Sequence, residues 1–198
     1  MKVKTGDTVQ FGSYPQTNPY NNVAEPIQWK VLAVEGDKAL LLSQDCIENV
    51  RYNDELVPST WATCTLRKWC NETFLEGAFT PEERAQILKT TLTNPGNQQF
   101  GTDGCEDTED CVFALSIEEL EQYLPEKSQR LAPATEVAKN HNAYVYPDTG
   151  NAIWWLRSPG CNAINASRVT VGGSVCGLIY DDARPHRTAR PAMWVKAD

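Results

Sequence analysis

Patterns typical of strands occupy both ends of this chain of 198 residues, and patterns typical of helices lie between them. Residues 27–34 and 38–43 flank Glu35-Gly36-Asp37, which is a hairpin pattern with glycine in the turn. The other strand-like runs are residues 7–15, 153–157, 168–171, 174–176 and 192–195. This order predicts a single α+β domain, residues 1–198, in which the two ends of the chain meet in one sheet.

The middle of the chain contains signals for short helices. Residues 65–74 place Leu66, Trp69, Cys70 and Phe74 on one helical face. Two further helices should begin with capping boxes, at residues 80–83 and 116–119, and run to about residues 88–89 and 123. Residues 132–139 predict another turn or two, and residues 94–110 a polar loop. We therefore expect short helices packed on antiparallel sheets.

Charge and hydropathy exclude several classes of partner. Eighteen basic and 26 acidic residues give a net charge of −8, which disfavours nucleic acid and anionic membrane surfaces as partners. Neither a signal peptide nor a membrane-spanning run is evident. The composition leaves the compartment open: the cell surface or a virion if the protein is exported, the cytoplasm if it is not.

Seven cysteines occur without a CxxC pair, and the chain contains only two histidines, His141 and His186. This pattern disfavours a structural zinc site, and we expect no metal or other cofactor. Reduced, partly buried thiols are the main interpretation, and a bridge between Cys105 and Cys111 is the alternative in an oxidising compartment. The five acids of residues 103–110 do not match an EF-hand loop, so they favour a solvated acidic face over a calcium site.

One segment differs from the rest of the chain in composition. Residues 160–190 contain no Lys, Glu, Gln, Trp or Met, although these five types make up about a fifth of the whole chain. Chance would produce such a gap in about one trial in a thousand. A codon of the form AAC or AAT whose adenines are randomised can encode every amino acid except these five. The segment is therefore interpreted as a diversified surface.

Alternation within this segment suggests which side chains are displayed. Val169, Val171, Gly173 and Val175 keep a period of two, so Arg168, Thr170, Ser174 and Cys176 should share the opposite, solvent-facing side. Such a division lets outward side chains change while the buried volume stays constant. With the surrounding loop positions, the predicted ligand-binding residues are Asn162, Ile164, Asn165, Arg168, Thr170, Ser174, Cys176, Leu178, Tyr180, Asp181, His186 and Arg187.

Motifs on both sides of this segment carry a resemblance. WWLRSPG at residues 154–160 and RPAMW at residues 190–194 resemble the C-terminal part of variable proteins of diversity-generating retroelements, which have a C-type lectin-like fold. GDTVQFGSYPQ, PIQWKVL and ALLLS resemble an uncharacterised bacterial domain family that often carries this ending. The resemblance implies a noncovalent surface for a protein or cell-surface ligand, supported by framework residues Trp154, Trp155, Arg157 and Trp194.

Two other functions stay open. The chain also resembles, more faintly, the formylglycine-generating enzyme group, which shares the lectin-like scaffold and implies an enzyme that uses Cys161, Cys176 and His186 near one cleft. The spacing of the two cysteines does not match a paired metal site, and His186 has no partner identifiable from the sequence, so we expect no catalytic residues. The remaining alternative is a structural subunit of a cell surface or virion.

Overall fold

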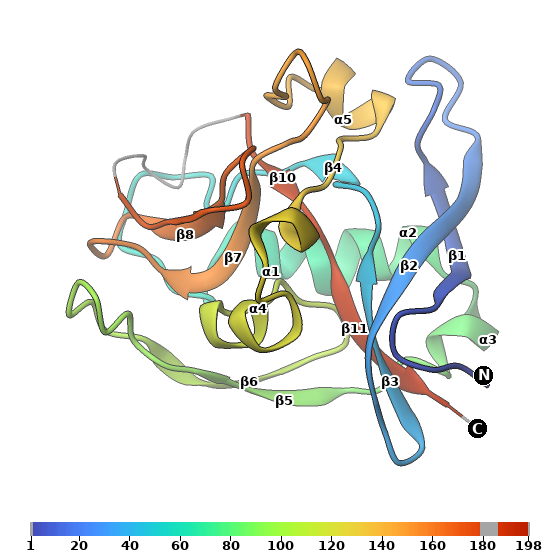
Figure 1. The fold of residues 1–198 in the computed structure, drawn as a ribbon, viewed down its shortest axis with the longest axis horizontal. Helices are drawn as coiled ribbons and strands as arrows, with labels where there is room; N and C mark the ends of the chain where they lie inside the picture. The colour runs from blue at the N-terminus through green and yellow to red at the C-terminus, as the bar shows by residue number, and fades with distance from the viewer. Residues whose placement is uncertain (1, 179–185, 198) are drawn as a thin grey trace.

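The computed structural model describes residues 2–178 and 186–197. It contains two main sheets with short helices packed around them (Figure 1). The strands are β1 (Thr8–Pro15), β2 (Ala24–Glu35), β3 (Lys38–Ser43), β4 (Glu48–Asn49), β5 (Thr90–Asn94), β6 (Cys105–Asp110), β7 (Trp154–Pro159), β8 (Ala166–Val169), β9 (Val175–Cys176), β10 (Thr188–Ala189) and β11 (Ala192–Lys196). The helical segments are α1 (Thr65–Trp69), η1 (Cys70–Phe74), α2 (Leu75–Ala78), α3 (Pro81–Arg84), α4 (Ile117–Tyr123), η2 (Lys127–Arg130) and α5 (Glu136–Asn140). The predicted α+β class is confirmed.

The first sheet joins the two ends of the chain. Its strand order is β1-β2-β3-β11, and the predicted hairpin forms β2 and β3. The C-terminal strand runs antiparallel to β3, with Ala192 opposite Leu42 and Lys196 opposite Lys38. Figure 1 shows the two termini close together at this sheet. The prediction that both ends meet in one sheet is confirmed.

The second sheet has the strand order β4-β10-β7-β8-β9 and carries the segment of unusual composition. Its neighbours are antiparallel except for β7 and β10, which are parallel where Thr188 lies opposite Trp154. The expectation of purely antiparallel sheets is therefore wrong at this pair. In this sheet β9 lies on one side of β7 and β10 on the other. Strand β10 runs in the same direction as β7.

The aromatic residues of the WWLRSPG motif are buried in the core. Trp154 and Trp155 are fully buried, and their indole nitrogens donate to the carbonyl oxygens of Arg130 and Val50 at 3.1 and 2.9 Å. Both belong to one hydrophobic cluster with side chains of the first sheet, including Trp29. Their burial supports a framework role, while the organisation as one domain stays a prediction.

The helices at Thr65, Pro81 and Ile117 begin where the sequence indicates, whereas α5 begins at Glu136 instead of residue 132, and two helices end elsewhere. The capping boxes at Thr80 and Ser116 are both present. The helix from Thr65 continues through the π-helical turn η1 to Ala78, beyond the expected Phe74. By contrast, α3 ends at Arg84, because the backbone at Leu88 instead pairs with β11, donating to the Trp194 carbonyl at 2.8 Å. Among the described residues, no helix is long and apolar enough to cross a membrane.

Residues 94–110 do not form the polar loop that was expected. Their C-terminal part is strand β6, which pairs antiparallel with β5, with Leu92 opposite Thr108. The buried side chains of β6 are Thr108 and Asp110, and its exposed ones, Glu106, Asp107 and Glu109, are all acids. A strand whose inner face is polar lacks the alternation of apolar side chains that indicates a strand. This explains why the sequence did not reveal it.

Candidate ligand-binding surface

The unusual segment begins with a loop, residues 160–165, that is held closely to its surroundings. The amide of Cys161 donates to the Gly177 carbonyl at 2.8 Å, and the amide of Ser59 donates to the Ala163 carbonyl at 2.9 Å. Inside the loop, the Asn162 side-chain oxygen accepts from the Ile164 amide at 3.0 Å. The backbone of this loop is therefore fixed both to β9 and to the chain that precedes α1.

The hairpin of β8 and β9 follows this loop at the edge of the second sheet. Arg168 lies opposite Cys176, and the Thr170 amide donates to the Ser174 carbonyl at 2.9 Å. The turn between them contains Gly173, whose φ is 80°, and a Cβ there would lie 2.2 Å from the Lys127 carbonyl oxygen. The tip of the hairpin thus packs directly against the backbone of η2.

Three of the predicted surface residues are buried, and the expectation that they face solvent is wrong. Asn165, Arg168 and Arg187 are 8%, 4% and 6% exposed. All four residues of β8 are buried, so this strand is covered on both faces and alternation does not distinguish its two sides. The Arg168 guanidinium donates to the Leu178 carbonyl at 3.1 Å, and that of Arg187 lies 5.9 Å from the Trp155 ring centre. Arg168 therefore links β8 to residue 178 within the segment, and Arg187 connects the segment to the framework.

The other predicted residues that the structure describes are exposed or half-buried, but they do not form one patch. Asn162 and Ile164 lie beside the chain at Ser59. Thr170 and Ser174 lie at the hairpin tip near η2, and Cys176 lies opposite Arg168 on β9. Leu178 is 49% exposed, and its carbonyl oxygen accepts a hydrogen bond from the Arg168 guanidinium. Tyr180 and Asp181 lie outside the described residues.

A groove of about 590 Å³ lies beside the start of the segment. One wall is formed by residues 58–60 and 63, another by residues 100–104, and the third by residues 159 and 161–163. Its volume is in the range of small-ligand sites in proteins. Asn162 is the predicted residue that lines it. No sequence pattern indicated the first two walls, because they lie in loops far from residues 160–190 along the chain.

His186 and Arg187 line a different hollow, together with residues 139, 142–144 and 153. The His186 Nδ1 lies 2.8 Å from the Asn142 carbonyl oxygen, and the His186 amide donates to the Asn49 side chain at 3.2 Å. Its φ is 117°, which is unusual for a residue other than glycine. Because Cys161 lines the first groove and His186 this hollow, the described structure does not place the three residues of the enzymatic alternative around one cleft.

The seven cysteines, all within the described residues, carry free thiols. The predicted alternative of a bridge between Cys105 and Cys111 is therefore not present in the structure. Nor do the described residues contain a group of three or more His, Cys, Asp or Glu side chains that could hold a metal ion. In the acidic stretch, the Asp110 carboxylate instead accepts from Arg67 Nε at 2.7 Å and from Trp61 Nε1 at 2.9 Å.

Burial should separate the cysteines by reactivity. Burial raises the pKa of Cys46 from its usual 9.0 to about 11 and also raises the pKa of Cys70. Raising the pKa of Cys46 by about two units lowers its thiolate fraction at pH 8 about a hundredfold. We expect iodoacetamide to alkylate the half-buried Cys161 and Cys176 in the folded protein while Cys46 and Cys70 stay unmodified, as read by peptide mass spectrometry.

The same reaction in urea is the control, in which all seven cysteines should react. Rapid alkylation of Cys46 in the folded state would show that the core opens much more often than its packing indicates. A stoichiometric reaction of Cys161 or Cys176 at pH 6 would instead reveal an activated thiolate and favour the enzymatic alternative.

The fold and this surface define a class of protein: an α+β domain in which strands of a segment of restricted composition form part of the second sheet. A family model described as "Domain of unknown function (DUF6273)" matches residues 36–197. The chain belongs to this family. Comparisons with curated proteins and with solved structures found no significant match.

Proposed function

We propose that this protein is a ligand-binding display protein whose C-terminal segment, residues 160–190, recognises a protein or cell-surface ligand noncovalently. We further propose that the domain has a C-type lectin-like fold and is a variable protein of a diversity-generating retroelement. The observation that carries the proposal is the combination of two features in one segment. Its residue types match adenine-randomised codons, and in its described part, residues 160–178 and 186–190, buried anchors fix the backbone while the side chains between them reach solvent.

The fixed backbone matters because it lowers the cost of binding. A preformed surface does not have to be ordered when a ligand arrives, so an exchanged side chain changes affinity through shape and charge. Asn165 and Arg168 are buried, and Arg168 also holds the backbone in place by donating to the Leu178 carbonyl at 3.1 Å. We therefore assign variation to the more exposed positions Asn162, Ile164, Thr170, Ser174, Cys176, Leu178 and His186, and from the sequence to Tyr180 and Asp181.

The DNA around the gene tests the origin of the segment. The proposal expects a second, nearly identical copy of codons 160–190 nearby, with adenines at the codons of the variable positions, and an adjacent gene for a reverse transcriptase. Mismatches between the two copies should be confined to those adenines. A locus with neither the repeat nor the reverse transcriptase would contradict the proposed genetic mechanism.

Tolerance of the exposed positions tests the display function directly. We expect a surface-display library that randomises Asn162, Ile164, Thr170, Ser174, Cys176 and Leu178 with NNC codons to stay folded in most clones, measured as resistance to protease. Exposed substitutions shift stability by about 0.5 kcal/mol or less each. Selection of this library against a purified protein should then yield binders that lose affinity when these six positions are restored.

The matched control is a library that applies the same codons to Asn165 and Arg168, in which most clones should be cleaved. The first library omits His186, because the positive φ at this position restricts the residue types that fit there. Equal protease resistance of the two libraries, or a folded first library that yields no binders, would contradict a display function.

A further inference from the structure

The groove beside Asn162 differs from the rest of the proposed surface because most of its lining comes from outside residues 160–190. Residues 58–63 reach it from the chain before α1, and residues 100–104 from the connection between β5 and β6. These walls contain none of the proposed variable positions. Whatever they recognise would be a part of the ligand that stays the same when the segment changes.

The walls of the groove are held in place by contacts that leave little freedom. The Asn97 side chain donates to the Pro159 carbonyl at 2.8 Å, and the Asn97 amide to the Thr102 carbonyl at 2.8 Å. The Phe100 ring packs on Gly177, where a Cβ would lie 2.8 Å from the ring. At Gly104, a Cβ would lie 2.1 Å from the Asn94 carbonyl oxygen. The groove therefore exists before any ligand binds.

The charge of the groove is negative. Among the described residues that line it, none is Lys, Arg or His, and Asp103 is the acid. The Asp103 side chain is exposed and has no hydrogen bond or ion pair within the described chain. The basic residue nearest to Thr63 along the chain is Arg67. Its Nε forms an ion pair with Asp110 Oδ1 at 2.7 Å. A cation in the groove would therefore meet a carboxylate that has no competing partner among the residues that the structure describes.

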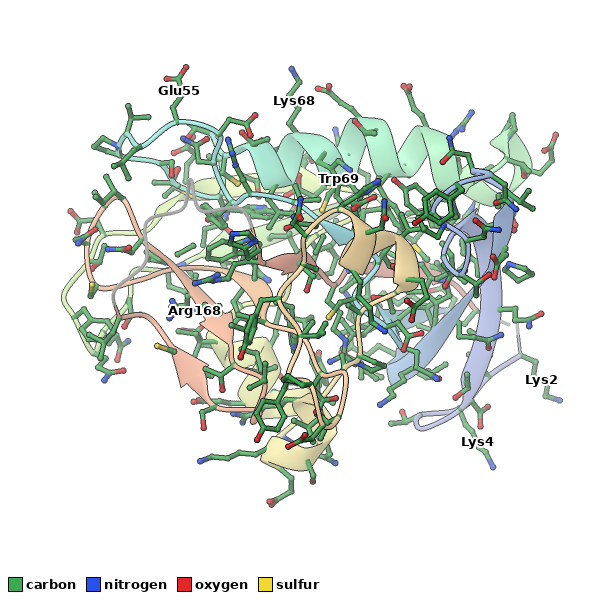
Figure 2. The ribbon with its side chains drawn as sticks, turned by 90° about the horizontal axis from the view of Figure 1, so that it is seen from above. Lys2, Lys4, Glu55, Lys68, Trp69 and Arg168 are labelled. Atoms are coloured by element: carbon green, nitrogen blue, oxygen red, sulfur yellow. The ribbon has the colours of Figure 1, made fainter. Side chains whose placement is uncertain are left out.

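Further acids continue this charge along both walls. Asp54 and Glu55 are exposed in the chain that leads to Pro58, and Figure 2 shows Glu55 pointing outward from the molecule. Glu106 and Asp107 are exposed on β6, directly after Gly104. Acids on both sides attract a cationic ligand toward the groove before contact. The half-buried Phe100 adds an aromatic face, on which a guanidinium group packs favourably.

We propose that this groove binds an arginine side chain of a protein ligand, with the Asp103 carboxylate as its counter-charge and the Phe100 ring as its apolar support. Arginine fits better than lysine because its planar guanidinium can donate two hydrogen bonds to one carboxylate and stack on a ring. This inference rests on the proposed function, since it names the fixed chemistry that accompanies the variable contacts. The proposed variable positions around it would then select among ligands that present an exposed arginine.

Two tripeptides that differ in charge but hardly in shape test the proposal. The probes are acetyl-Gly-Arg-Gly-amide and the same peptide with citrulline, a neutral isostere, in place of arginine. We expect the arginine peptide to shift the backbone amide signals of Asp103, Gly104 and Asn162 saturably in ¹H–¹⁵N NMR spectra. Its dissociation constant should be about fivefold lower than that of the citrulline peptide, the upper range for an exposed ion pair.

Two aspartate variants and one phenylalanine variant identify the contact. Asp103→Asn should weaken the arginine peptide about fivefold, to the level of the citrulline peptide. Asp148→Asn is the matched control, because it removes the same charge from an exposed position that does not line the groove, and it should leave the dissociation constant almost unchanged. Phe100→Leu should weaken the arginine peptide about threefold through loss of the cation–π contact.

The proposal is overturned if the citrulline peptide binds as tightly as the arginine peptide, or if the shifts lie elsewhere. It is also overturned if the two aspartate variants weaken binding equally, because the attraction would then come from the net charge alone. Failure here can be distinguished from failure of the proposed function. A randomised library that still yields binders would leave the display function intact and remove only the arginine preference.

Discussion

Replacing Arg157 by methionine is expected to lower the free energy of unfolding by about 3 kcal/mol, the lower end of the cost of breaking a buried ion pair from one side, because the Glu119 side chain is 23% exposed. The Arg157 guanidinium is 4% exposed and forms a bidentate pair with Glu119, with Nη2 at 2.9 Å from Oε1. It also donates to the carbonyl oxygens of Ala114 and Thr93 at 3.1 and 3.3 Å. Methionine fills a similar volume but leaves these carbonyl groups without the Arg157 donors and the Glu119 carboxylate without its counter-charge, with the Ser116 amide at 2.9 Å as its remaining donor.

The measurement is urea unfolding followed by tryptophan fluorescence, with Lys68→Met as the matched control. The Lys68 side chain is 72% exposed and points away from the molecule (Figure 2), so its removal should cost about 0.5 kcal/mol or less. Arg157→Lys should fall between the two, because lysine keeps the charge but cannot form the bidentate pair. A loss below about 1 kcal/mol for Arg157→Met would contradict this role. Since whole domains are stable by about 5–15 kcal/mol, the expected loss is large.

The spacing of apolar residues and the capping signals were sufficient to predict the helices and strands whose buried side chains are apolar. The hairpin of β2 and β3 has Leu40, Leu41 and Leu42 in its core, and glycine in its turn. The capping boxes at Thr80 and Ser116 depend on residues three apart, so both could be identified from the sequence. These local signals, combined with the order of the elements, were enough for the α+β class and for the meeting of the two chain ends.

Polar residues in buried positions account for what the sequence could not reveal. Asp110 is buried on β6 because it accepts from Trp61 and Arg67, which precede it by more than forty residues. Arg168 is buried on β8 because the chain at Leu178 covers it. In both cases the partner that hydrogen-bonds the charged group lies outside the strand. A local pattern therefore assigns such a residue to the surface.

The candidate site was predictable only where a signal was confined to consecutive residues. The restricted composition of residues 160–190 identified one wall of the groove, including Asn162. Asp103 belonged to an acidic stretch that the sequence indicated as a solvated face, and its exposure agrees with that. Its position opposite Asn162 depends on the pairing of β5 with β6 and on the contacts of Asn97 with β7. Such long-range contacts leave no mark in a single sequence.

The two neighbouring glycines of the hairpin tip are expected to respond very differently to the same substitution. Gly173→Ala should lower the free energy of unfolding by about 3 kcal/mol, whereas Gly172→Ala should change it by about 0.5 kcal/mol or less. At Gly173 the positive φ of 80° costs an alanine about 1–2 kcal/mol. The added Cβ would also lie 2.2 Å from the Lys127 carbonyl oxygen, and such overpacking costs about 1–3 kcal/mol. At Gly172 no atom lies within 4 Å of an added Cβ.

Urea unfolding of the two variants, compared in parallel, measures this difference, and equal stabilities would show that the hairpin tip does not rest on η2. The comparison also bears on how a diversified segment stays folded. Adenine-randomised codons can encode glycine, so composition alone does not separate Gly172 from Gly173. Packing does separate them, because the hairpin can lie this close to Lys127 only if position 173 has no side chain. We therefore expect folded clones to retain glycine at position 173 when both positions are randomised, and to accept other residues at position 172.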